Sequence, residues 1–180
     1  MTKLQDRIVN PNPEIQHHVF KPNGNFPNSK LPLLVYKNAC LLGKQINVAV
    51  ETLQMLFNKN GWKNSWANGI YTFHHFHSNT HECMGIAAGK AWVVFGGIKG
   101  QKFTLKKGDI IIIPAGLAHR CSKVSSDFLC VGAYPKGKDY DIMLGKPEEL
   151  EKIKHRLENI PVPPCDPIYG KEGFLKSFWR

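Results

Sequence analysis

The chain has 180 residues, 42% of them hydrophobic, which suits one domain with a well-buried core. Its formal net charge of +10 could attract nucleic acid, anionic lipid or a small anionic ligand, but the longest basic run is the pair Lys106 and Lys107 in an expected turn. Scattered solvated lysines are favoured, so neither a nucleic-acid nor a membrane partner is expected, while a small-molecule ligand, anionic or not, stays open.

The cysteines and the most apolar run exclude several other classes of protein. The five cysteines form an odd set without a Cys-x-x-Cys pair, so neither a disulfide framework nor a cysteine zinc site is predicted. The first twenty residues lack the apolar segment of a signal peptide. The run Ile110–Ile113 ends at Pro114, far short of a membrane span. A cytoplasmic location is therefore expected.

The first third of the chain predicts an extended arm followed by one helix. Residues 1–45 carry five prolines among many asparagines, which favours an arm packed on the domain over a helix. An amphipathic helix is predicted over residues 46–61, because apolar residues recur there at three- and four-residue intervals and Gly61 stands where a C-cap glycine would lie. These apolar residues are Val50, Leu53, Leu56 and Phe57.

The middle of the chain, over residues 66–135, changes to short β-branched or aromatic runs separated by glycine-containing turns. The expected strands cover residues 70–76, 83–88, 91–95, 102–105, 110–113 and 128–134. Many short strands at close spacing indicate an antiparallel sandwich or barrel rather than β-α-β units. A helix over 146–160 follows, with glutamates early and basic residues late, and a proline-rich tail over 161–180 completes a single domain spanning 1–180.

A dense histidine cluster is the main candidate for chemistry. Four of the eight histidines fall between His74 and His81, and Glu82 follows directly. Side chains at i and i+2 of a strand share a face, so His75 and His77 are expected to point together into the interior. A polar loop then lets Glu82 open the next strand and return beside the pair. Two imidazoles and a carboxylate on one side are typical of a metal site.

A second segment, from Gly108 onward, predicts a strand that ends in a Pro-Ala-Gly turn and delivers His119. Here the chain resembles the cupin superfamily, whose two motifs have the forms GxxxxxHxHxxxxExxxxxxG and GxxxxxPxGxxHxxxN. The matching residues are Gly69, His75, His77, Glu82 and Gly89 in the first motif and Gly108, Pro114, Gly116 and His119 in the second. The one departure is Lys123, which stands where the second motif has Asn.

The resemblance implies an all-β core, the cupin double-stranded β-helix or jelly-roll barrel, with an N-terminal arm and helix and a C-terminal helix. It assigns His75, His77, Glu82 and His119 as the ligands of one divalent metal ion. The segment Asp127–Gly137 and parts of the arm resemble a bacterial cupin family of YjlB type, so the similarity covers nearly the whole chain. That family implies a fold and a metal but no established reaction. Cupins often pair through their sheets, so a homodimer is expected.

The alternative to a metal is a stabilising polar network among the same four side chains, and the metal is favoured because buried His and Glu need partners. Three imidazoles and a carboxylate suit Fe(II), Mn(II), Ni(II), Co(II) or Zn(II) and are too nitrogen-rich for Ca(II) or Mg(II). His81 is an alternative ligand, although a structural hydrogen bond is favoured for it, and His74 is expected to face away. The residues expected to line a substrate pocket are Tyr71, Phe73, Met84, Ile86 and Tyr134.

Three functions remain open from the sequence. Serine-hydrolase, P-loop and Rossmann motifs are absent from the sequence, so those chemistries lack support. The first hypothesis is a metal-dependent enzyme, a dioxygenase or an isomerase, that acts on a small oxygen-bearing molecule. The second is a non-catalytic metal-bearing module for binding or sensing, and the third is a structural dimerisation unit. No residue besides the metal ligands is an unambiguous general base, so the catalytic residues and enzyme status stay open.

Overall fold

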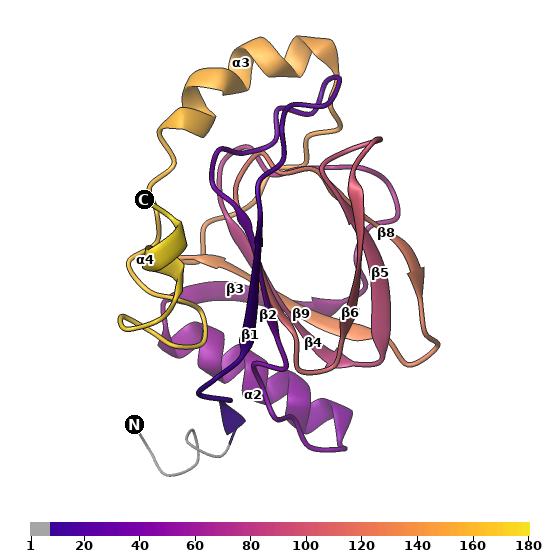
Figure 1. Ribbon diagram of the computed structural model, residues 1–180, viewed down its shortest axis with the longest axis vertical. Helices are drawn as coiled ribbons and strands as arrows, with labels where there is room; N and C mark the ends of the chain where they lie inside the picture. The colour runs from indigo at the N-terminus through magenta and orange to yellow at the C-terminus, as the bar shows by residue number, and fades with distance from the viewer. Residues whose placement is uncertain (1–7) are drawn as a thin grey trace.

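The computed structural model describes residues 8–180, apart from the side chain of Glu149, so the first seven residues of the predicted arm lie outside the described residues. One sheet contains, in spatial order, β1 (Glu14–His18), β2 (Leu33–Lys37), β7 (Ile110–Ile113), β4 (Glu82–Ala88), β9 (Leu129–Pro135) and β3 (Trp62–Asn68). The other contains β6 (Gln101–Lys106), β5 (Lys90–Phe95) and β8 (His119–Val124). The two antiparallel sheets face each other and enclose a barrel (Figure 1). The predicted all-β jelly-roll core is confirmed.

The N-terminal arm enters the barrel as two strands of the larger sheet. It was predicted only to pack on the domain, but β2 lies between β1 and β7 and pairs with β7 along the register Leu34–Ile112 to Tyr36–Ile110. The run from Leu33 to Tyr36 is fully buried, because the sheet has packed layers on both faces here. Short apolar runs of this kind are typical of buried strands. The prediction of an arm relied on the prolines of this region and gave this apolar run too little weight.

Two apolar clusters lie on the two faces of the larger sheet. Ile110 and Ile112 pack on the outer face with the helix α2 (Ile46–Lys59), while Ile111 and Ile113 point between the sheets. This alternation explains why a run of four isoleucines is buried on both sides. The buried residues of α2 are Ala49, Leu53, Leu56 and Phe57. α2 thereby covers part of the outer face of the larger sheet (Figure 1).

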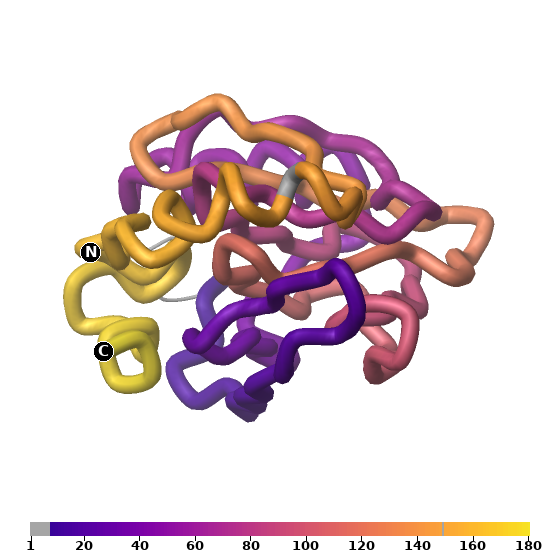
Figure 2. Tube along the Cα trace, turned by 90° about the horizontal axis from the view of Figure 1, so that it is seen from above, coloured from indigo at the N-terminus to yellow at the C-terminus, as the bar shows by residue number. Residues whose placement is uncertain are grey.

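The C-terminal region adds two further helices. α3 (Pro147–Glu158) lies across one end of the barrel, next to the loop of the arm around Phe26, and Ile153 packs there with Phe26 and Phe76 (Figure 2). α4 (Leu175–Phe178) and the tail before it pack beside the larger sheet. None of the helices in the described part of the chain has the length and apolar character needed to cross a membrane.

The strand predicted over residues 70–76 is wrong in its position. The strand β3 comes earlier, at Trp62–Asn68, and pairs with β9, whereas residues 75 and 76 form only single β-bridges, with His119 and Met143. The polar sequence of β3 hid it, because β3 is an edge strand whose residues are mostly exposed, and edge strands tolerate Lys and Asn. The segment after β3 is thus free to leave the sheet and carry histidines across the barrel opening.

Candidate metal centre

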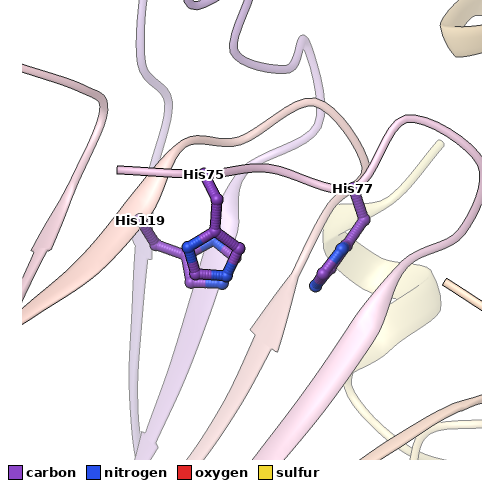
Figure 3. Close-up of side chains that lie close together, drawn as sticks. All are labelled: His75, His77 and His119. Carbon is purple, nitrogen blue, oxygen red and sulfur yellow. The ribbon is translucent and has the colours of Figure 1, made fainter. Parts of the chain in front are cut away.

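Three imidazoles from two distant parts of the chain come together at one end of the barrel. His75 and His77 lie on the segment between β3 and β4, and His119 opens β8. The backbones of His75 and His119 exchange hydrogen bonds of 3.1 and 2.8 Å, which sets their rings side by side with centroids 4.2 Å apart. His77 is directed toward the same space (Figure 3), and one ring nitrogen of each histidine lies within 4.8 Å of the other two.

Backbone carbonyls fix the tautomer of all three rings. Each Nδ1 lies within hydrogen-bonding distance of a main-chain carbonyl oxygen, at 3.1 Å for His75 and for His119. A carbonyl can only accept, so each Nδ1 carries the hydrogen and each Nε2 of the neutral ring keeps its lone pair. The acceptors belong to Phe73, Asp141 and Leu117. This is the tautomer that allows Nε2 to ligate a metal.

Glu82 places a carboxylate beside two of the imidazoles. Its Oε2 lies 3.4 Å from Nε2 of His77 and 3.6 Å from Nε2 of His119, and only 3% of the residue is exposed. Its other oxygen, Oε1, accepts a hydrogen bond of 3.1 Å from the Tyr134 hydroxyl, which itself accepts one of 2.8 Å from the Trp66 indole. Burial and the charge of Glu82 raise the pKa of Tyr134, so the phenol stays protonated as a donor. The carboxylate is therefore held by one oxygen while the other faces the histidines.

Burial and the neighbouring carboxylate Glu82 determine the pKa values of the three histidines. It lowers the pKa of His75, and it lowers the pKa of His119 well below the usual value, with the neighbouring histidines adding to the effect. Burial also lowers the pKa of His77, but the charge of the neighbouring Glu82 and the hydrogen bond to the Asp141 carbonyl outweigh it, so the net pKa is raised. His75 and His119 are thus neutral near pH 7, the form that metal ligation requires.

The donor set fits a divalent transition metal better than a metal-free polar network. Metal-bound nitrogen and oxygen lie about 2.0–2.2 Å from the ion, so two donors on one ion are up to about 4.2 Å apart. The contacts of 3.4 and 3.6 Å made by Glu82 fall inside that limit. They are longer than the roughly 2.7–3.2 Å of a typical N–H···O hydrogen bond, so the histidines and the carboxylate do not satisfy one another well directly. A cation bound between the histidines and the carboxylate would satisfy all of these groups.

The segment that follows β9, residues 136–146, is a strap that holds the loop carrying His77. The Asp141 carboxylate accepts hydrogen bonds from the backbone N–H of Ser78, at 2.6 Å, and from its hydroxyl, and Arg156 of α3 donates to both Asp141 and Ser78. The neighbouring Phe76 and Met143 exchange backbone hydrogen bonds of 3.0 and 2.9 Å. The Asp141 side chain thereby fixes the loop that carries His77.

The two other histidines of the motif region lie outside the cluster. His81 accepts a hydrogen bond of 2.9 Å at Nδ1 from the backbone of Ala115 and packs on Trp179, and burial lowers its pKa to about 4. His74 accepts a hydrogen bond of 3.0 Å from Arg120. Their contacts agree with the structural role expected for His81 and with the outward direction expected for His74.

A pocket of about 600 Å³ opens beside the cluster. It is lined by all four proposed ligands and by four of the five predicted wall residues, Tyr71, Phe73, Met84 and Tyr134. Ile86 differs from the prediction, because it shares the inward face of Met84 but lies two residues, about 6.6 Å, further along β4, where it is packed between the sheets. Tyr140 also lines the pocket, and no pattern in the sequence had indicated it.

Comparisons with known proteins identify the family of the chain. The cupin family matches residues 63–133. The uncharacterized protein YjlB of Bacillus subtilis (strain 168) is 38% identical over 167 residues, which cover 92% of this chain and 97% of that protein. Among solved structures, acireductone dioxygenase from Bacillus anthracis is 13% identical with a TM-score of 0.38, over 71% of this chain and 82% of that one. Oxalate decarboxylase from Bacillus subtilis is 14% identical with a TM-score of 0.35, over 78% of this chain and 30% of that one. The chain therefore belongs to the cupin family and is a YjlB-like member of it.

Proposed function

We propose that the protein holds one divalent transition-metal ion with His75, His77, Glu82 and His119, and that it binds and transforms a small oxygen-bearing molecule there, as a dioxygenase or an isomerase. One observation carries the proposal: three imidazoles with the same tautomer and a buried carboxylate meet at the wall of a pocket of about 600 Å³. This donor set suits Fe(II), Mn(II), Ni(II), Co(II) or Zn(II).

The protein residues have separate tasks in this proposal. A bound ion would supply Lewis-acid or redox chemistry to an oxygen atom of the ligand. The histidines hold their Nε2 atoms toward one point, and Tyr134 keeps its proton and orients Glu82. Met84 and the aromatic side chains of the pocket give this space an apolar wall.

The contact between Tyr134 and Glu82 gives a direct prediction. Tyr134→Phe removes the hydroxyl that fixes Oε1 of Glu82, and loss of such an outer partner typically weakens metal affinity by about 10- to 100-fold. Zinc affinity, measured by competition with a chromophoric chelator, should fall within that range. Tyr140→Phe is the matched control, since its hydroxyl hydrogen-bonds with Tyr71 and Glu82 acts on it only through its charge, and its zinc affinity should stay at the wild-type value. Equal affinities for both variants would contradict an orienting role for Tyr134.

A second candidate function is a non-catalytic binding or sensing module with the same metal. Apart from the four proposed ligands, the residues of the described chain that line the pocket offer only tyrosine hydroxyls as acid or base groups. Such a pocket can bind a ligand without a residue poised for proton transfer. The homodimer and the cytoplasmic location remain predictions from the sequence.

The experiment that tests the proposed function is elemental analysis of protein purified from its native host without oxygen. Mass spectrometry of the small molecules released on denaturation completes it. One equivalent of a transition metal is expected, together with turnover of the released molecule by the metal-loaded protein. A ligand recovered unchanged after incubation would favour the binding module. Protein without metal and without a ligand would reject both functions and favour a structural dimerisation unit.

A further inference from the structure

The pocket beside the histidine cluster has no cationic wall. None of its lining residues, all of which belong to the described part of the chain, is Lys or Arg, and Glu82 is the only carboxylate among them. The chain has 24 lysines and arginines, so this lack does not come from its composition. Phosphates and carboxylates are usually bound by Arg, Lys or helix N-termini. The lining therefore disfavours a ligand with a charged group on the part that does not contact the metal.

Aromatic rings take the place of charges around the pocket. Tyr71 and Phe73 stack at 5.0 Å with an interplanar angle of 26°, and both contact the His75 ring, at 5.2 and 5.5 Å. Tyr134 and Tyr140 stack at 4.9 Å and 22°, and the Tyr140 ring lies 5.1 Å from that of His77. The aromatic rim formed by Tyr71, Phe73, Tyr134 and Tyr140 thus borders the cluster on two sides.

Part of the aromatic rim remains accessible for stacking. Tyr71 and Phe73 are each 45% exposed, although they adjoin the buried His75. Large apolar rings that line a pocket while half-exposed offer surface to a ligand, and aromatic pairs gain stability beyond the area that they bury. The pocket volume of about 600 Å³ lies in the range of roughly 300–1,000 Å³ for small-molecule sites. A ligand of one or two rings fits this space.

We propose, building on the function proposed above, that the natural ligand is an uncharged planar ring compound with two adjacent oxygen atoms, of which catechol is the simplest example. Its ring would lie against the aromatic rim, and its two oxygens would face the cluster. A divalent ion beside the single carboxylate of Glu82 leaves one net positive charge, which suits a ligand that binds through one ionised and one neutral oxygen. A bound sugar phosphate or dicarboxylate carries two negative charges, so part of its charge would remain unneutralised beside the uncharged walls of the pocket.

The test uses the full chain loaded with one equivalent of zinc, because zinc is redox-inert and leaves the probe intact. Calorimetric titrations would compare catechol with resorcinol, whose two hydroxyls are not adjacent, and with oxalate and glucose 6-phosphate. Catechol is expected to bind at least tenfold more tightly than each of the other three. Equal or tighter binding of resorcinol, oxalate or glucose 6-phosphate would overturn the inference.

Variants of the aromatic rim test the stacking surface. Phe73→Leu keeps an apolar side chain but removes the ring, and it should weaken catechol binding about tenfold, the loss that corresponds to one stacked aromatic contact. Zinc stoichiometry should stay at one per chain, which shows that the variant is folded. Ile98→Leu is the control at a site 78% exposed and away from the pocket lining, and it should bind catechol as the wild type does. Equal catechol affinity in the two variants would overturn the role of the rim.

The outcomes separate this inference from the proposal on which it rests. Wild-type protein that takes up no zinc would overturn the proposed function, and the ligand class with it. Protein that binds one zinc per chain but not catechol would leave the metal centre standing and overturn the ligand class alone.

Discussion

Zinc at about 1,000 times its dissociation constant is expected to raise the melting temperature of the metal-free protein by roughly 8–16 °C. A ligand that binds only the folded state stabilises it by about 4 kcal/mol at that ratio. In a domain of this size, 1 kcal/mol corresponds to about 2–4 °C. Only the folded chain brings His75 and His77 within reach of His119, more than forty residues later, so the unfolded chain should bind zinc far more weakly.

The control for this prediction is a histidine outside the cluster. Thermal unfolding of each variant would be followed with and without zinc, so that any loss of intrinsic stability cancels in the comparison. His119→Ala should abolish the zinc-induced shift, whereas His155→Ala, at an exposed position on α3, should retain it. A full zinc-induced shift in His119→Ala would show that zinc binds elsewhere on the chain.

The three clustered histidines could be found from the sequence because two local rules placed them. The alternation of side chains put His75 and His77 on one side, and it held even though this segment forms single β-bridges rather than a full strand. The glycine and proline pattern around Pro114 predicted the turn before His119. The predicted direction of these side chains stays correct even when the strand is predicted at the wrong residues, because it requires only an extended backbone over three residues.

The remaining parts of the site depend on contacts between distant segments. Tyr140 reaches the pocket because the strap after β9 folds back onto the loop of His77, with Asp141 binding Ser78. These residues are 63 positions apart, and no periodicity links them. Likewise, the position of β2 inside the larger sheet is set by its pairing with β7, not by the proline-rich sequence around it. Tertiary pairing decides these features, and a single sequence does not display it.

The C-terminal tail is anchored by one buried carboxylate. Asp166 is 1% exposed and accepts four hydrogen bonds, which join the tail to β2 and to α4. Burial raises the pKa of Asp166, and the hydrogen bonds oppose that rise. The donors are the Tyr36 hydroxyl at 2.7 Å and the backbone N–H groups of Ile168, Tyr169 and Leu175 at 2.9, 3.0 and 3.2 Å. The tail in turn places Trp179 against His81, directly before Glu82.

Asp166→Ala is therefore expected to lower the free energy of unfolding by at least about 3 kcal/mol, because it leaves several donors around a buried site without an acceptor, at about 1–3 kcal/mol for each such group. Urea unfolding would measure the loss. Tyr36→Phe removes one of the four bonds and should cost about 1 kcal/mol. Asp139→Ala, whose carboxylate makes an exposed hydrogen bond with Asn64, should stay within about 0.5 kcal/mol of wild type. If Asp166→Ala were no less stable than Asp139→Ala, the Asp166 carboxylate would not be an anchor of the tail.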